Sequence, residues 1–328
     1  MILTDTLVPT DPLLSTQSGG TMALSSATIA QDTTPASKGL LSNASTVTLS
    51  IDTDGVIADS IWSVGPVSLR DRTSVAGNVT SGGAITAVNG AVVHGTSTPN
   101  TTVQTRTVTI SVSFPSSSNN QNVATDLGNL APGAYGTFTF NSGGAATFSA
   151  GTYFFQGLSF NSGSTMRINS SGGSIFIYVM TTLAFQRGTQ TLVGGNANAL
   201  RVVCFGTGTV FMQMAFTGTV VAPLATINFQ GSSITYSGAF FGNSITGGPN
   251  LTYARNPFPS WTETPSNPML VAPAKLAAPS AATPPASRSA APRAAKSPPA
   301  APAPREGARH PEGPKPAASR ARATKKKK

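Results

Sequence analysis

This chain is short of charge, of cysteine and of long apolar runs. Only 10% of its 328 residues are charged, and its one cysteine, Cys204, cannot form a disulfide within the chain, so the fold must rest on burial and backbone hydrogen bonds. No apolar stretch reaches the length of a membrane span, so we expect no integral membrane segment. The residues after Met1 lack the basic and apolar regions of a signal peptide, which leaves open an intracellular location or an export segment upstream.

Acidic residues are missing from a long central stretch. From Leu130 to Phe258 there is no Asp or Glu, and Asp126 is the nearest acid. A hydrolase or lyase that acts on polysaccharides needs clustered carboxylates, or a metal with a basic residue beside it. We therefore expect no enzyme: no catalytic residue, no cofactor and no metal.

Aromatic residues are missing from the end of the chain. Between Pro268 and Lys328 there is no Phe, Tyr or Trp, and this stretch holds 13 of the 25 prolines and 13 Lys and Arg against two acids. These cations account for the net charge of +10, because the preceding residues carry about as many acids as bases. Such a composition cannot bury enough apolar area to fold, so residues 263–328 are expected to be a disordered tail rich in Pro, Ala and Lys.

The cations of the tail form a candidate site for an anionic polymer, whether glycan, wall polymer or nucleic acid. Without aromatic side chains to stack on bases, binding to a nucleic acid would be blind to sequence. The alternative is a solubilising linker with no dedicated partner. The candidate binding residues are Arg305, Arg309, Lys315, Arg320, Arg322, Lys325, Lys326, Lys327 and Lys328.

Short alternating runs predict an all-β body over residues 44–262. Val47, Leu49 and Ile51 alternate with polar residues, as in a half-buried strand. Asp54-Gly55 then predicts a tight turn, which we interpret as a hairpin between two strands. Residues 1–43 have weaker patterning and are expected to be weakly ordered, with one edge strand.

Short motifs recur at a nearly fixed period. Val-x-Gly occurs at residues 75–77 and again at 93–95, a spacing of 18 residues, and Phe-Asn-Ser-Gly occurs at 140–143 and 160–163, a spacing of 20. Strands closed by Gly or Asn at such a period are typical of the coils of a parallel β-helix, or β-solenoid, with apolar side chains inside. Residues 101–130 interrupt the period as a decoration or as the join between two stacks. The alternative is an antiparallel sandwich.

A resemblance supports the solenoid. Ala150-Gly-Thr-Tyr-Phe154, Ile175-Phe-Ile-Tyr-Val179 and Gly238-Ala-Phe-Phe-Gly242 appear in the order found in an uncharacterised bacterial surface domain, abundant in myxobacteria and related to minor-pilin-associated proteins. The resemblance covers residues 130–258 and implies a right-handed parallel β-helix at the cell surface. Residues 67–95 also resemble coils of bactofilins, which are polymer-forming cytoskeletal solenoids.

Several isolated residues invite a chemical interpretation. Asp52, Asp54 and Asp59 superficially match a calcium loop, but Ile61 stands where the closing acid belongs, so a turn with solvated acids is preferred. Cys204 is expected to be a buried small residue and His94 a lone histidine at a coil corner. Trp62 and Trp261, which flank the body, are expected to cap the ends of the stack.

Two functions follow as hypotheses. The first is a non-enzymatic structural or adhesive protein of the cell surface or matrix, with a rigid β-helix and a polyanion-binding tail. The second is an intracellular scaffold similar to bactofilins, which polymerises by self-association of the β-helix while the tail recruits DNA or membrane.

Overall fold

The computed structural model describes residues 2–7, 14–17, 19–25, 28–30, 41–104 and 106–255. These residues form a parallel β-solenoid of about 10 turns. The predicted fold class is therefore confirmed. The antiparallel sandwich is excluded, because the stacked strands pair in parallel and the antiparallel pair, β1 (Ile2–Leu7) with β15 (Arg106–Ser111), lies outside the stack.

The solenoid consists of two sequence segments, which we call the amino half (residues 14–98) and the carboxyl half (residues 121–255). The strands of the amino half are β2 (Leu14–Thr16), β3 (Met22–Ser25), β4 (Thr28–Ala30), β5 (Leu41–Asn43), β6 (Leu49–Asp52), β7 (Val56–Ile57), β8 (Ile61–Ser63), β9 (Val67–Leu69), β10 (Ser74–Val75), β11 (Val79–Ser81), β12 (Ile85–Ala87), β13 (Val92–Val93) and β14 (Ser97–Thr98).

The carboxyl half has longer strands, several of which line two sides of a coil. They are β16 (Gln121–Val123), β17 (Asp126–Leu130), β18 (Gly133–Phe140), β19 (Ala145–Ser149), β20 (Gly151–Phe160), β21 (Thr165–Asn169), β22 (Ile175–Phe185), β23 (Thr189–Gly194), β24 (Leu200–Cys204), β25 (Val210–Met212), β26 (Phe216–Phe229), β27 (Thr235–Gly247) and β28 (Thr252–Arg255), with one 3₁₀ turn, η1 (Ala197–Ala199), among the described residues.

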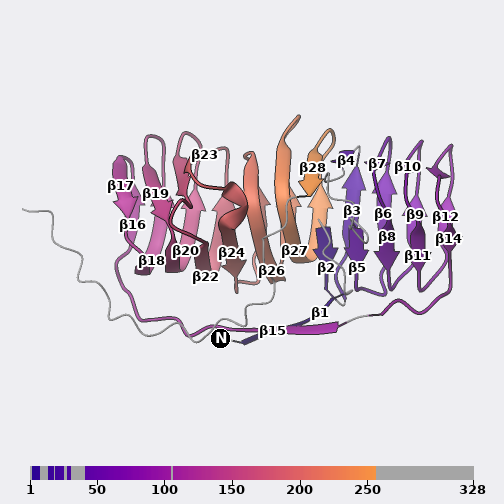
Figure 1. Cartoon of the computed structure of the whole chain (residues 1–328), viewed down its shortest axis with the longest axis horizontal. Coiled ribbons are helices and arrows are strands. Elements are labelled where there is room, and N and C mark those ends of the chain that lie inside the picture. The colour runs from indigo at the N-terminus through magenta and orange to yellow at the C-terminus, as the bar shows by residue number, and fades with distance from the viewer. Residues whose placement is uncertain are drawn as a thin grey trace, which may run out of the picture. The chain divides into compact units, whose positions relative to one another are not determined.

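The order of coils along the stack differs from the order of the sequence. The stack begins with β16 and runs to β27 and β28, whose next neighbours are β2, β3 and β4, and it ends with β14 (Figure 1). Thus the last described strand lies against the first coil of the amino half. Residues 1–43, expected to be weakly ordered, contribute β2–β5 to the middle of the stack.

The sequence period is the coil period. Val75 lies beside Val93, and Phe140 beside Phe160, as their spacings of 18 and 20 residues predict. The two phenylalanine rings stack with their centroids 4.6 Å apart, and Phe185 continues the column 6.0 Å from Phe160. These side chains are fully buried, so each rung removes a large apolar area from water and favours a fixed register between coils.

Corners of the coils use residues that accept a positive φ. Gly143 and Gly163 adopt φ of 82° and 77° at equivalent corners of the carboxyl half. In this region a Cβ atom clashes with the backbone, and only glycine enters it without cost. The sharp turns therefore follow from the glycines that close each repeated motif.

Candidate interaction surfaces

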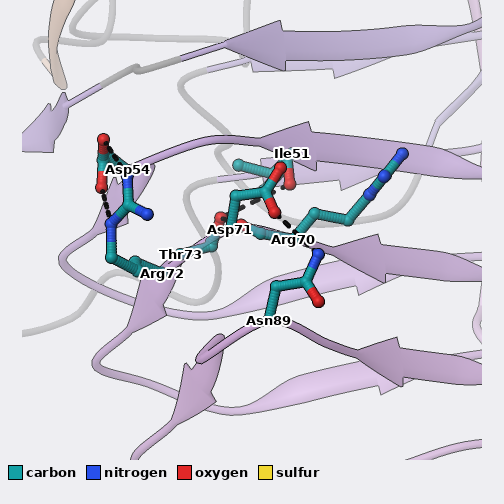
Figure 2. Close-up of polar contacts among 7 residues, drawn as sticks. All are labelled: Ile51, Asp54, Arg70, Asp71, Arg72, Thr73 and Asn89. Atoms are coloured by element: carbon teal, nitrogen blue, oxygen red, sulfur yellow. Dashed lines mark hydrogen bonds and ion pairs between the residues drawn. The ribbon is translucent and has the colours of Figure 1, made fainter.

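One column of corners in the amino half carries three of its charged side chains, Asp54, Asp71 and Arg72. Residues 53–54, 71–72 and 89–90 all have positive φ and lie one coil apart. Arg72 donates two hydrogen bonds to the carboxylate of Asp54, at 2.7 and 2.8 Å (Figure 2). One coil further, the amide of Asn89 donates to Asp71 at 2.8 Å. Polar side chains at adjacent corners are thus joined by hydrogen bonds, and in the pair of Arg72 with Asp54 the charges also neutralise each other.

This geometry decides between the interpretations of Asp54. The turn at Asp54 is confirmed, but the hairpin is wrong: β6 pairs in parallel with β3 and β9, and β7 with β4 and β10. The hydrogen bond from Arg72 lowers the pKa of Asp54, so this carboxylate already has a cationic partner. Within the described ranges, no three His, Cys, Asp or Glu side chains lie close enough to share a metal ion.

A second ion pair lies on the carboxyl half. Arg167 of β21 donates to the carboxylate of Asp126 at 2.7 and 2.8 Å, across the intervening strand β19. The backbone N–H of Gly128 also donates to Asp126, and this bond, followed by that of Arg167, lowers the pKa of the carboxyl. A carboxylate held in this way is a weak proton acceptor at neutral pH.

The other singled-out residues occupy ordinary places. Cys204 is buried at 1% exposure, and this burial raises the pKa of its thiol to about 11, so it is a poor nucleophile. The ring of His94 lies 3.3 Å from the hydroxyl of Ser74 on an exposed corner. Trp62 does not cap the stack, because its strand β8 lies between β5 and β11. Trp261 lies outside the described residues.

An apolar stripe on the outside of the carboxyl half escaped sequence analysis. Tyr178, Phe154 and Phe241 point outward from strands whose neighbouring residues point inward. A signal existed: runs such as Tyr153-Phe154-Phe155 are apolar on both faces, which is typical of a strand covered on both sides. The rungs of this outer stripe are Ala134, Phe154, Tyr178, Val203, Val221 and Phe241.

The stripe is covered by the chain segment that joins the two halves, residues 99–120, which we call the strap. Val112 and Phe114 of the strap pack against the stripe, and the ring of Phe114 meets the rings of Phe154 and Phe205 edge-on at 5.9 and 5.3 Å. Gln156 fastens the strap further by donating to the carbonyl of Ser117 at 2.7 Å. The interruption in the repeat is thus the join between the halves.

A second outer face carries mostly small polar side chains, with Phe211 and two alanines among them, at the spacing of the coils, about 4.8 Å. None of the residues that form its rungs is charged, and most of them are partly or fully exposed. This flat face extends over both halves. Its rungs are Asn122, Thr139, Ser159, Ala184, Phe211, Asn228, Thr246, Ala23, Ser50, Ser68 and Thr86.

The nine cations of the candidate polyanion site, from Arg305 to Lys328, lie outside the described residues. No helix in the described part of the chain is long and apolar enough to cross a membrane.

Comparison with known proteins adds no functional assignment. No family model, curated protein or solved structure matches the chain. The similarities to the myxobacterial surface domain and to bactofilins therefore remain predictions.

Proposed function

We propose that this protein is a non-enzymatic structural element of the cell surface or matrix, in which a rigid β-solenoid displays a cationic tail that binds an anionic polymer. One observation carries the proposal: most of the cations that could bind a polyanion are outside the solenoid. The rungs of the flat face are uncharged, and Arg72 and Arg167 are paired with carboxylates. The tail holds 13 Lys and Arg.

The separate roles of the solenoid and the tail have a physical basis. A solenoid is held by backbone hydrogen bonds and apolar rungs at every coil, so it resists bending and keeps its faces regular. Its flat face of Ser, Thr and Asn can form hydrogen bonds to a neutral surface such as a glycan. The tail adds a long-range, salt-dependent attraction, because each cation that meets a phosphate or sulfate releases a counterion.

Binding of fluorescent heparin and of duplex DNA to the full chain tests the role of the tail. One variant replaces the nine cations named above with Gln, and a control replaces the three solenoid residues Arg70, Arg187 and Arg201 with Gln. If about six phosphates are engaged, the logarithm of the DNA affinity falls with that of salt with a slope near −5. Only the tail variant should lose binding. Equal binding by the tail variant and the unaltered chain would refute the proposal.

A specific feature favours a second candidate, a self-associating scaffold. The coil at the end of the amino half has no charged residue between Ala84 and Asn100, and Val88 and Val92 are 38% and 46% exposed. Edge strands usually carry charges that prevent pairing with another chain. Negative-stain microscopy of the full chain would show filaments if this edge pairs between copies, and separate particles otherwise.

A further inference from the structure

The stack is interrupted at one point, which we call the junction. Leu14–Thr16 pairs with Phe240–Gly242, and Met22–Leu24 pairs with Ile245–Gly247. These segments are more than 200 residues apart in the sequence. Across every other step between described coils of a half, the chain itself continues into the next coil, whereas at the junction two coils meet without this connection.

The contacts at the junction are those of any other step in the stack. Gln17 N donates to Gly242 O at 3.1 Å, and Ile245 N donates to Thr21 O at 2.8 Å. The side chain of Gln17 donates to Asn243 at 2.7 Å. Leu14 and Met22 are buried beside their register partners Phe240 and Ile245. Two complementary faces therefore bind each other without help from a covalent connection beside them.

The strap is the covalent link between the halves, and each of its ends is anchored on its own half. Val103 packs against Ala44 and Trp62 of the amino half, whereas Phe114 packs against Phe154 and Phe205 of the carboxyl half. The chain thus crosses from one half to the other between Val103 and Phe114. Gln104, next to Val103, is exposed and belongs to no strand.

This arrangement permits exchange between molecules. If the amino half of one copy docks on the carboxyl half of another, every junction contact forms again, and Val103 and Phe114 keep their own partners. Residues 104–111, when extended, span about 26 Å. Two sheets packed face to face lie about 10 Å apart, so the extended segment is long enough to reach a neighbouring solenoid. The crossing segment contains β15, which pairs with β1 of the same chain, so this pair moves with the segment and only its path changes. That is the condition for low-cost domain swapping.

We propose that the partner for the junction faces is a second copy of this chain, so that two copies exchange halves and form a dimer of two complete solenoids joined by two crossing straps. The exchange does not depend on the function proposed above. Swapping requires the junction to open, so the two forms interconvert slowly once folded. The proportion of dimer is then set by the protein concentration during refolding.

A disulfide across the junction tests the exchange directly. Ala23 and Thr246 are register partners that point outward, and a parallel pair of this kind has the Cα separation that a disulfide accepts. The test protein carries Ala23→Cys and Thr246→Cys with Cys204→Ala, and is refolded at low and high concentration before oxidation. The control carries Ser50→Cys and Ser68→Cys, a register pair within the amino half.

We expect a dimer whose fraction increases with refolding concentration. On a non-reducing denaturing gel, the dimer fraction of the test protein runs at twice the mass of the chain, while the control runs at the mass of one chain. The absence of a dimer, or a dimer whose test chains separate at single mass, overturns the proposal. So does failure of the test disulfide to form in either fraction, because the junction would then not exist.

A second measurement does not depend on cysteine variants. Light and isotopically heavy chains are unfolded, mixed and refolded at high concentration, and the dimers are weighed by native mass spectrometry. Inserting Gly-Ser residues after Gln104 lengthens the segment that crosses between the halves within one molecule. This longer segment should shift the protein toward monomer. A mixed dimer population that this insertion leaves unchanged contradicts exchange through the strap.

Discussion

The hydroxyl of Thr16 donates a hydrogen bond of 2.6 Å to the side-chain oxygen of Asn43, and both residues are fully buried. They are register partners in adjacent coils, and Ser63 and Ser81 continue the same column. The amide of Asn43 donates to the hydroxyl of Ser63 at 3.0 Å. A polar column thus runs inside the amino half from its first coil, next to the junction.

Removing the Asn43 amide should destabilise the solenoid. Asn43 also accepts from Ser45 N and donates to the carbonyl of Val47, so Asn43→Ala leaves several buried groups without partners. We expect a loss of about 3 kcal/mol in the free energy of unfolding, measured by urea denaturation. Asn122→Ala, on the exposed flat face, should change it by no more than about 0.5 kcal/mol. Equal losses would show that the column is not a special source of stability.

Gly20 tests the close approach at the junction. A Cβ atom on Gly20 would lie 1.5 Å from the carbonyl oxygen of Asn243, so Gly20→Ala must push the two halves apart. The expected cost is about 3 kcal/mol, with faster hydrogen exchange at the amides of Gln17 and Ile245. Gly208, which has open space around it, provides the control Gly208→Ala. Unchanged exchange at these amides in Gly20→Ala would contradict the junction.

Cleavage of the strap should leave the two halves bound to each other. The loop after Phe114 is partly exposed. Cleavage at a protease site inserted after Ser117 would separate the carboxyl half from the amino half and the part of the strap that includes Phe114. After cleavage, the junction and the packing of Phe114 should hold the two fragments together. Size-exclusion chromatography should give the elution volume of the uncut protein, and denaturing gels should show two pieces. Fragments that separate without denaturant would mean that the junction is too weak to close the stack.

Stability should fall at alkaline pH. Burial raises the pKa of Cys204 to about 11 and that of Tyr153 to about 12, so the folded state binds these protons more tightly than the unfolded state. Their contribution is complete below the ordinary thiol pKa and is lost as pH rises through the folded values. Between pH 9 and 11, a group of this kind changes the free energy of unfolding by up to about 1.4 kcal/mol per pH unit.

The variant Cys204→Ala assigns part of this effect. It should be less stable at neutral pH because of the cavity, but its stability should decline less steeply above pH 9 when followed by urea denaturation. In the unaltered protein, the thiol should react with a disulfide reagent at pH 8 only after unfolding. Rapid reaction in the folded state would contradict the burial of Cys204.

The solenoid itself could be predicted from sequence because its coils repeat locally. Glycines such as Gly143 and Gly163 mark equivalent corners, and the spacing of Phe140 and Phe160 is the length of one coil. The turn at Asp54 was predictable for the same reason, since a positive φ is a local property. The hairpin was a wrong inference, because the choice of strand partner depends on the coils above and below.

The order of the halves could not be predicted. Any coil face with apolar rungs and a free backbone edge can pair with another. Nothing in the sequence around Leu14 and Met22 therefore identifies Phe240 and Ile245 as their register partners. The strap was equally hidden, because Phe114 stands alone among Ser, Pro and Asn. Only the outward Phe154 and Tyr178 indicated that something must cover the sheet.

The permuted stack is tested most directly by one distance. Asn228 and Thr86 belong to opposite halves, and five steps along the flat face separate them. With Cys204→Ala and spin labels at these two positions, pulsed electron paramagnetic resonance on the monomer should give a narrow distance distribution centred at about 24 Å. A broad distribution, or one centred far beyond that distance, would mean that the amino half does not lie on the end of the carboxyl half.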